Sequence, residues 1–270
     1  MPHFKGTEAE IWYEMVGPEG APVLVWVGGG GTLGRDWHRF QTPHFSGAFR
    51  NLVFDNRGIG ATRSEAPMPW PIESFARDLA ELCAAVAGGP AIFIGTSLGS
   101  AIVQQLCIDR PDLVRAAILM GTGAWSTGWG WDYQEAEIEF RRQGGRLDGM
   151  MGVTHYAAML YPARALGDRV LWPKLKALML ESMDSGENEQ SLVPQWDASL
   201  RFDQRTALPK VKVPVHVLAF AEDSIEEPTG AKQSNVALMQ RRQRSPLKLD
   251  LVGVRDAARL HPTLPDRLCA

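Results

Sequence analysis

The chain has 270 residues, 45% hydrophobic and 22% charged, which is enough for one large hydrophobic core or two modest ones. Its net charge of −3 argues against nucleic acid or an anionic membrane surface as a partner. The three cysteines show neither the pattern of a disulfide framework nor metal-ligand spacing, and no apolar segment resembles a signal peptide or a membrane span. We therefore expect a cytoplasmic protein.

Apolar runs and helical periodicities alternate along most of the chain. Continuous apolar runs, typical of strands buried on both faces, occur at 22–27, 51–55, 91–94, 114–120, 213–220 and 247–252. Apolar residues at helical spacing predict helices over 72–86 and 100–109. This alternation predicts an α/β fold with a mostly parallel, doubly wound sheet.

Residues 121–208 interrupt the alternation. The pattern there is helical at 133–143 and 171–183, with glycine and proline turns between. An insertion this long between two strands is not a simple loop. We expect a helical cap over 122–208, on a core formed by residues 1–121 and 209–270.

Aromatic residues gather at the start of this expected cap. Trp125, Trp129 and Trp131 lie close together, and His155 follows later in the cap. These side chains suit an apolar pocket for a small hydrophobic molecule, as do Tyr133, Met150, Met151, Met159 and Tyr161. They equally suit contacts that hold the cap to the core, with His155 as a hydrogen-bond partner between the two.

The segment Gly95-Thr96-Ser97-Leu98-Gly99 joins a predicted strand to a predicted helix. Gly-x-Ser-x-Gly in this context is typical of a nucleophile elbow, a turn so tight that only glycine fits on either side of the serine. Ser97 is therefore a candidate nucleophile, and the Leu98 N–H a candidate donor to a developing oxyanion. An ordinary strand–helix turn that happens to contain serine is the alternative.

Four consecutive glycines, Gly28 to Gly31, follow the first buried strand. No Lys-Ser/Thr pair follows, as a phosphate-binding loop requires. We expect the loop to approach the serine closely and to supply a second oxyanion donor from Gly29, although a flexible turn would have the same composition. Asp55 and Arg57, at the end of the next strand, are expected to fix neighbouring loops.

Taken in order, these motifs resemble the α/β-hydrolase superfamily over nearly the whole chain, and most closely its small bacterial aclacinomycin-methylesterase-type members, which act on esters of polyketides and related metabolites. The run from Pro209 to Phe220 looks like the segment that precedes the catalytic acid in that family. The resemblance implies that Ser97 is the nucleophile and that Asp223 orients a histidine, although Asp223 also suits a solvated turn. We expect no cofactor and no metal.

The sequence departs from the family pattern at the expected histidine, which Asp256 replaces. A carboxylate with an ordinary pKa near ~3.9 is a weak base toward a hydroxyl. His261, five positions further on, is a candidate displaced base, although His261-Pro262 resembles a simple turn before a helix.

Two functions therefore remain open. In the first, the protein is a serine hydrolase that cleaves an ester or thioester of a small hydrophobic metabolite through an acyl-Ser97 intermediate. In the second, it has lost hydrolysis and binds a ligand or catalyses a non-hydrolytic step of the cyclase or lyase type. The intact serine motif favours the first function, and Asp256 counts against it.

Overall fold

The computed structural model describes residues 2–184, 192–218 and 220. These residues form one mixed sheet of eight strands, in the order β1-β2-β4-β3-β6-β7-β8, with β5 paired to β2. The strands are β1 (His3–Lys5), β2 (Ala9–Val16), β3 (Val23–Val27), β4 (Arg50–Phe54), β5 (Arg63–Ser64), β6 (Ala91–Thr96), β7 (Val114–Met120) and β8 (Val215–Leu218). Strands β4, β3, β6, β7 and β8 are parallel, and β1, β2 and β5 pair antiparallel. The predicted mostly parallel sheet is confirmed.

The central strand β3 is buried along its whole length because it lies between β4 and β6 and both sheet faces are covered. Successive side chains of a strand point to opposite faces. Val23, Val25 and Val27 accordingly join the larger hydrophobic cluster, whereas Leu24 and Trp26 join a second cluster.

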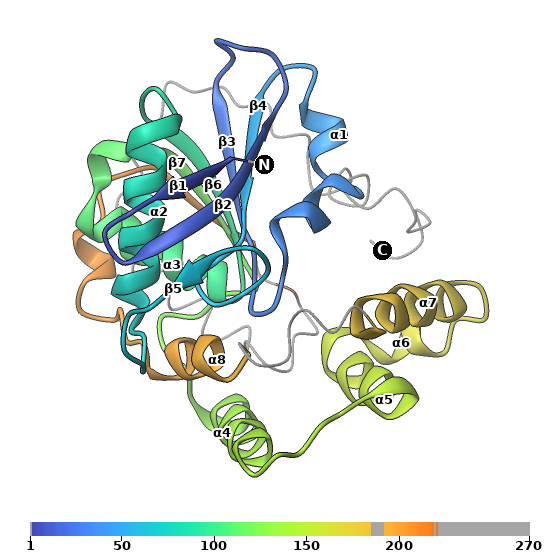
Figure 1. Ribbon diagram of the computed structural model, residues 1–270. Coiled ribbons are helices and arrows are strands. Elements are labelled where there is room, and N and C mark those ends of the chain that lie inside the picture. The colour runs from blue at the N-terminus through green and yellow to red at the C-terminus, as the bar shows by residue number, and fades with distance from the viewer. Residues whose placement is uncertain (1, 185–191, 219, 221–270) are drawn as a thin grey trace.

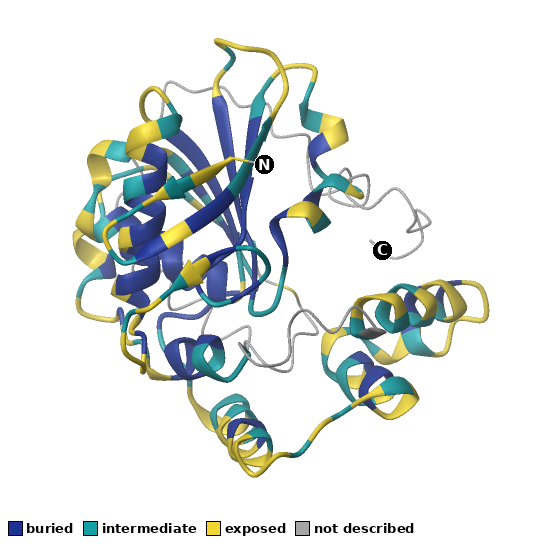
Figure 2. Cartoon of the chain, viewed as in Figure 1, coloured by how far each residue is buried: buried dark blue, intermediate teal, exposed yellow. Residues whose placement is uncertain are grey.

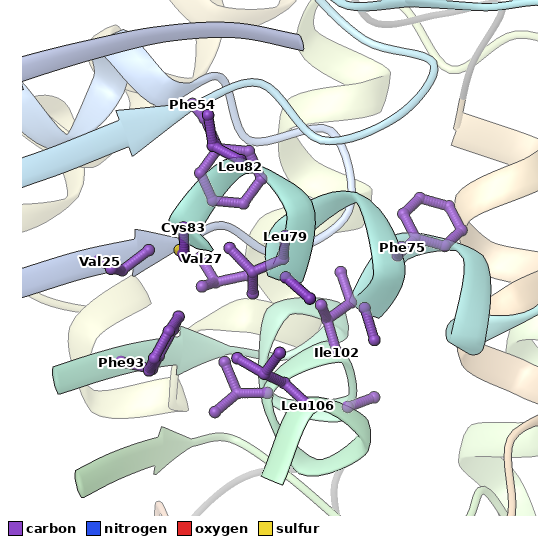
Figure 3. Close-up of a cluster of buried hydrophobic side chains, with 14 of the residues drawn as sticks. Val25, Val27, Phe54, Phe75, Leu79, Leu82, Cys83, Phe93, Ile102 and Leu106 are labelled. Carbon is purple, nitrogen blue, oxygen red and sulfur yellow. The ribbon is translucent and has the colours of Figure 1, made fainter. Parts of the chain in front are cut away.

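Helices cover both faces of the sheet, as expected for a doubly wound fold. The larger cluster packs α2 (Ile72–Val86) and α3 (Leu98–Asp109) against one face, as Figure 3 shows in close-up. On the other face lie a 3₁₀ turn, η1 (Gly34–His38), and the short helix α1 (Thr42–Phe45) (Figure 1). The prediction of a helix over 72–86 is confirmed to the residue.

Within the described residues, five helices lie between β7 and β8, and we call residues 128–201 the helical insertion. They are α4 (Gly128–Arg142), α5 (Gly149–Leu160), α6 (Ala163–Leu166), α7 (Leu171–Asp184) and α8 (Leu192–Arg201); a 3₁₀ turn, η3 (Leu208–Lys210), precedes β8. Helix α8 packs against both α4 and α3, while α5, α6 and α7 pack on one another. The insertion is more exposed than the sheet (Figure 2), and no helix in the described ranges is long and apolar enough to cross a bilayer. The predicted strand at 247–252 lies outside the described residues.

A buried ion pair ties the loop after β4 to α2. The guanidinium of Arg57 donates two hydrogen bonds to Asp78, from Nε at 2.8 Å and from Nη2 at 2.7 Å. Glu8 lies 3.1 Å from the same Nη2, and the side chain of Arg57 is fully buried. Burial raises the pKa of Asp78, and the hydrogen bonds from Arg57 partly offset that rise. The expected bidentate bonds of Arg57 are present, but their partner Asp78 lies in helix α2 and not in a neighbouring loop.

Arg57→Met is expected to lower the free energy of unfolding by about 3–5 kcal/mol at neutral pH, because it leaves the Asp78 carboxylate buried without a cation. The pKa of Asp78 then rises further above its unfolded value, so the folded state binds the proton more tightly. Stability of the variant should therefore fall as pH rises through this raised pKa. Urea unfolding between pH 5 and pH 8 measures both effects.

Arg110→Met is the matched control, since Arg110 forms a similar two-bond pair with Asp112 on the exposed surface. We expect no measurable change in stability for this variant. Equal losses for the two variants would contradict the role assigned to burial.

Candidate active site

Ser97 occupies the turn between β6 and α3 in a strained backbone conformation. Its φ is +51° and its ψ is −122°, and among the described residues it is the one non-glycine residue with positive φ. Such a conformation costs on the order of 1–3 kcal/mol and persists where the surrounding structure imposes it. The Ser97 N–H donates to the Met120 carbonyl at 3.0 Å, and its side chain remains exposed.

Both glycines of the motif are required by close backbone contacts. A Cβ on Gly95 would lie 2.6 Å from the carbonyl oxygen of Gly99, and a Cβ on Gly99 would lie 2.1 Å from that of Val27. Because the contacted atoms belong to the backbone, they cannot move away without a large energetic cost, so no residue larger than glycine fits at either position. The predicted tight turn is confirmed, and these contacts explain the motif.

Ser100 also holds this turn, although its role was not predicted from the sequence. Its hydroxyl is fully buried and lies 2.8 Å from the Gly95 carbonyl and 2.9 Å from the Met120 carbonyl. It therefore links the first turn of α3 to the ends of β6 and β7. A small polar residue directly after Gly-x-Ser-x-Gly was the available signal.

The glycine loop after β3 lies beside Ser97. A Cβ on Gly29 would lie 3.3 Å from the Cβ of Ser97, and the Thr32 N–H donates to the Gly29 carbonyl at 3.1 Å. Leu98 is in the first turn of α3, where N–H groups have no partner within the helix. The predicted donors, Gly29 and Leu98, thus both lie next to the serine, and their role as an oxyanion hole stays a prediction.

Two side chains after β4 anchor the loops around the serine. Asp55 accepts the N–H groups of Gly34 and Ala61, each at 2.8 Å. Burial raises the pKa of Asp55, and these two backbone hydrogen bonds oppose the rise. The amide of Asn56 donates to the Gly28 carbonyl at 3.0 Å. The expectation that Asp55 binds backbone donors is confirmed.

Ser97 borders a cavity of about 410 Å³ between the sheet edge and the helical insertion. This volume is within the range of small-molecule sites. The insertion supplies both apolar and polar lining, including Leu147, Met159, Leu160, Met179, Met183 and Leu192 on the apolar side and Tyr133, Glu137, Arg141 and Tyr156 on the polar side. Within the described residues, no group of three or more His, Cys, Asp or Glu side chains is placed to share a metal ion.

Four of the polar lining residues form one hydrogen-bonded cluster centred on the buried carboxylate of Glu137. Tyr133 donates to this carboxylate at 2.5 Å, and Tyr156 donates to its other oxygen. The guanidinium of Arg141 donates to the Tyr156 hydroxyl at 2.5 Å, and its nearest nitrogen lies 3.5 Å from Glu137. Burial, together with the hydrogen bond to Glu137, raises the pKa of both tyrosines, so both stay protonated and act as donors at neutral pH.

Of the residues predicted to line a pocket, Tyr133 and Met159 border this cavity, whereas Trp125, Trp129, Trp131 and His155 do not. Trp125 packs under a guanidinium at 4.7 Å from its ring centroid, and Trp129 is exposed. His155 lies behind the lining, with Nε2 2.6 Å from the Tyr133 hydroxyl. Trp131 is half-buried in α4. The aromatic lining comes from Tyr133, which was predicted, and from Tyr156 and Trp196, which were not.

Helix periodicity explains the difference. Tyr133, Glu137 and Arg141 are spaced four residues apart in α4, so they share one face, and this face borders the cavity. Helix α8 packs against α4, and Tyr156 of α5 donates to Glu137. Trp129 lies one turn earlier, where its ring stacks on Tyr133 at 5.1 Å but remains exposed. The i, i+4, i+8 spacing was the signal that the tryptophan cluster obscured.

The remaining predicted catalytic residues, Asp223, Asp256 and His261, lie outside the described residues. Their roles stay predictions.

Substitutions at Ser97 test whether its backbone is strained, independently of its chemical role. Ser97→Gly is expected to be more stable than Ser97→Ala by about 1 kcal/mol, because glycine adopts φ of +51° without strain and alanine does not. Ala84 provides the control, since it occupies an exposed position of α2, where Ala84→Gly should lower stability by a similar amount. Unfolding by guanidinium measures both differences in stability. Equal stability of Ser97→Gly and Ser97→Ala would show that the backbone at Ser97 is not strained.

Comparisons with known proteins agree with this geometry. A family model described as the alpha/beta hydrolase fold matches residues 22–226, more than half of the chain. A Mycobacterium tuberculosis protein named as a non-heme bromoperoxidase, BpoC, is 31% identical over 210 residues, covering 77% of this chain and 78% of that protein. A crystal structure of BpoC superposes with a TM-score of 0.76 at 27% identity, over 84% of this chain and 83% of that chain.

Two further matches are more distant. A protein of Azorhizobium caulinodans named as a carbamate hydrolase, RutD, is 24% identical over 226 residues, or 83% of this chain and 82% of that protein. The enol-lactonase of Burkholderia xenovorans shares the fold, with a TM-score of 0.72 and 22% identity over 87% of each chain. The sheet, the serine turn and these matches together show that the chain belongs to the α/β-hydrolase superfamily.

Proposed function

We propose that this protein hydrolyses an ester or thioester of a small, mainly hydrophobic metabolite through a covalent acyl-Ser97 intermediate. The observation that carries the proposal is Ser97 itself, held exposed and strained at the wall of a cavity. A binding protein has no chemical need for a serine in a strained conformation.

In the proposed reaction, the Ser97 oxygen forms a bond to the carbonyl carbon of the substrate and loses its proton to a base. The carbonyl electron pair moves onto oxygen, where the N–H groups of Gly29 and Leu98 stabilise the charge. Collapse of this intermediate breaks the bond to the alcohol or thiol, which leaves with a proton. Water then attacks the acyl-serine, which releases the carboxylic acid and restores Ser97.

The cavity lining supports an amphiphilic substrate. Methionine and leucine side chains of α5 and α7 line the apolar side, and flexible methionines adapt to irregular apolar groups. The cluster of Tyr133, Glu137, Arg141 and Tyr156 offers hydrogen bonds on the polar side. An acyl or alcohol group with a hydrogen-bonding substituent would use both sides of the cavity.

The base is proposed from the sequence alone. Asp223 would orient a displaced imidazole, for which His261 is the candidate, while Asp256 occupies the position where the family has its histidine. Among the relatives, the name of RutD denotes cleavage at a carbonyl carbon, which is the chemistry proposed for this chain.

A second candidate function follows from the same substitution. With Asp256 in place of histidine, the protein would bind a hydrophobic ligand in the cavity or catalyse a non-hydrolytic step. The serine turn favours hydrolysis, and reactivity of Ser97 distinguishes the two functions.

A fluorophosphonate probe is expected to label the protein stoichiometrically at Ser97, and p-nitrophenyl butyrate should be hydrolysed. Ser97→Ala should abolish both, because the hydroxyl is the proposed nucleophile. Ser199→Ala is the matched control, since Ser199 also lines the cavity and should not affect labelling. Intact-mass spectrometry and peptide mapping report the result. No labelling and no hydrolysis would favour the second function.

Restoring an imidazole tests whether Asp256 occupies the position of the family's catalytic histidine. The pair Arg255→Gly with Asp256→His is expected to raise turnover of p-nitrophenyl butyrate at least about tenfold, since an aligned general base contributes about 10²–10⁴-fold. The pair Arg255→Gly with Asp256→Asn is the control, because it removes the carboxylate without adding a base. Equal turnover of the two double variants would refute the assignment.

A further inference from the structure

Helix α8 contacts the glycine loop with one face. Leu192, Gln195 and Trp196 are spaced i, i+3 and i+4 and therefore lie on the same side of the helix. A Cβ on Gly31 would lie 2.6 Å from Leu192 Cδ2, and a Cβ on Gly30 would lie 3.0 Å from Trp196 Nε1. The last helix of the insertion thus packs directly on the loop beside Ser97.

Gln195 forms the polar contact at the centre of this face. Its Oε1 accepts the Gly31 N–H at 2.8 Å, and its Nε2 donates to the Arg57 carbonyl at 2.9 Å. The side chain is fully buried. Gly31 offers a donor and Arg57 an acceptor, so only one orientation of the amide satisfies both. A buried amide with both partners in place is costly to remove.

The glycine loop has little stiffness of its own, because four consecutive glycines restrict the backbone least of all residues. Side-chain amides hold it at both ends: Asn56 binds the Gly28 carbonyl, and Gln195 binds the Gly31 N–H. Gly29 lies between these two fixed points, next to Ser97. These two bonds, together with the Thr32 N–H that donates to the Gly29 carbonyl, therefore set the direction of the Gly29 N–H.

We infer that Gln195 is a positioning residue, which sets the Gly29 N–H for the oxyanion through the Gly31 backbone; this inference rests on the proposed hydrolase function. Gln195 does not touch the reacting atoms, since its amide is occupied by Gly31 and Arg57. Removing it should disturb stabilisation of the transition state more than binding of the substrate.

Gln195→Met tests the inference, because methionine keeps the length of the side chain and loses both hydrogen bonds. Gln104→Met is the matched control: Gln104 is equally buried in α3 and donates to Thr122 and to Gly123 at 2.7 and 2.9 Å. Hydrogen–deuterium exchange should show the amides of residues 29–32 exchanging at least about tenfold faster in Gln195→Met than in the wild type and in Gln104→Met. Unchanged exchange in this segment would overturn the inference.

Kinetics with p-nitrophenyl butyrate supply a measurement that should not change if Gln195 has only a structural role. We expect Gln195→Met to lower kcat at least about tenfold with KM within about twofold, since a misplacement near 1 Å can cost about 10²-fold. Gln104→Met should leave both constants within about twofold. Faster exchange with unchanged kcat, or a loss confined to KM, would show that Gln195 only supports the fold.

Gln195→Glu gives a second test if the methionine variant is too unstable. A protonated glutamic acid can accept from Gly31 and donate to Arg57, whereas the carboxylate cannot donate. Its kcat relative to the wild type should therefore recover as pH falls, and a pH-independent ratio would overturn the inference. A wild type that neither reacts with fluorophosphonate nor hydrolyses the ester would refute the proposed function instead, and the exchange measurement would still decide whether Gln195 holds the loop.

Discussion

The close backbone contact between the start of α3 and the end of β3 is the constraint on which the site depends. Gly99 approaches the Val27 carbonyl so closely that no side chain fits between them. Because the glycine loop begins at the residue after Val27, the contact that bends the chain at Ser97 also brings this loop beside it. The serine and its two candidate amide donors are therefore placed by one local packing arrangement.

Buried polar side chains then hold the loops that this packing brings together. Asp55 and Asn56 bind backbone groups of the loop after β3, and Arg57 binds α2. All three follow β4 at the carboxyl edge of the parallel strands, where open α/β sheets bind their ligands. Each of these bonds satisfies a buried donor or acceptor, so the loops have few alternative arrangements of similar energy.

The helical insertion contributes to the site in two ways. Helices α4 and α5 present the polar cluster around Glu137, whereas α8 packs on the core and contacts the glycine loop. Trp196 connects the two, since its indole lies against Gly30 and its ring centroid lies 5.0 Å from the guanidinium carbon of Arg141. The walls of the cavity and the proposed oxyanion donors are thus parts of one packed unit.

The sequence by itself determined the parallel strands, α2 and the serine turn, because apolar runs, helical periodicity and glycine requirements are local patterns. It missed β1, β2 and β5, which contain charged residues and therefore do not form continuous apolar runs. Tertiary structure alone decided which face of α4 lines the cavity and placed Gln195 on Gly31, 164 residues away. A periodic pattern shows which residues share a face of a helix, but what that face contacts depends on how separately formed elements pack.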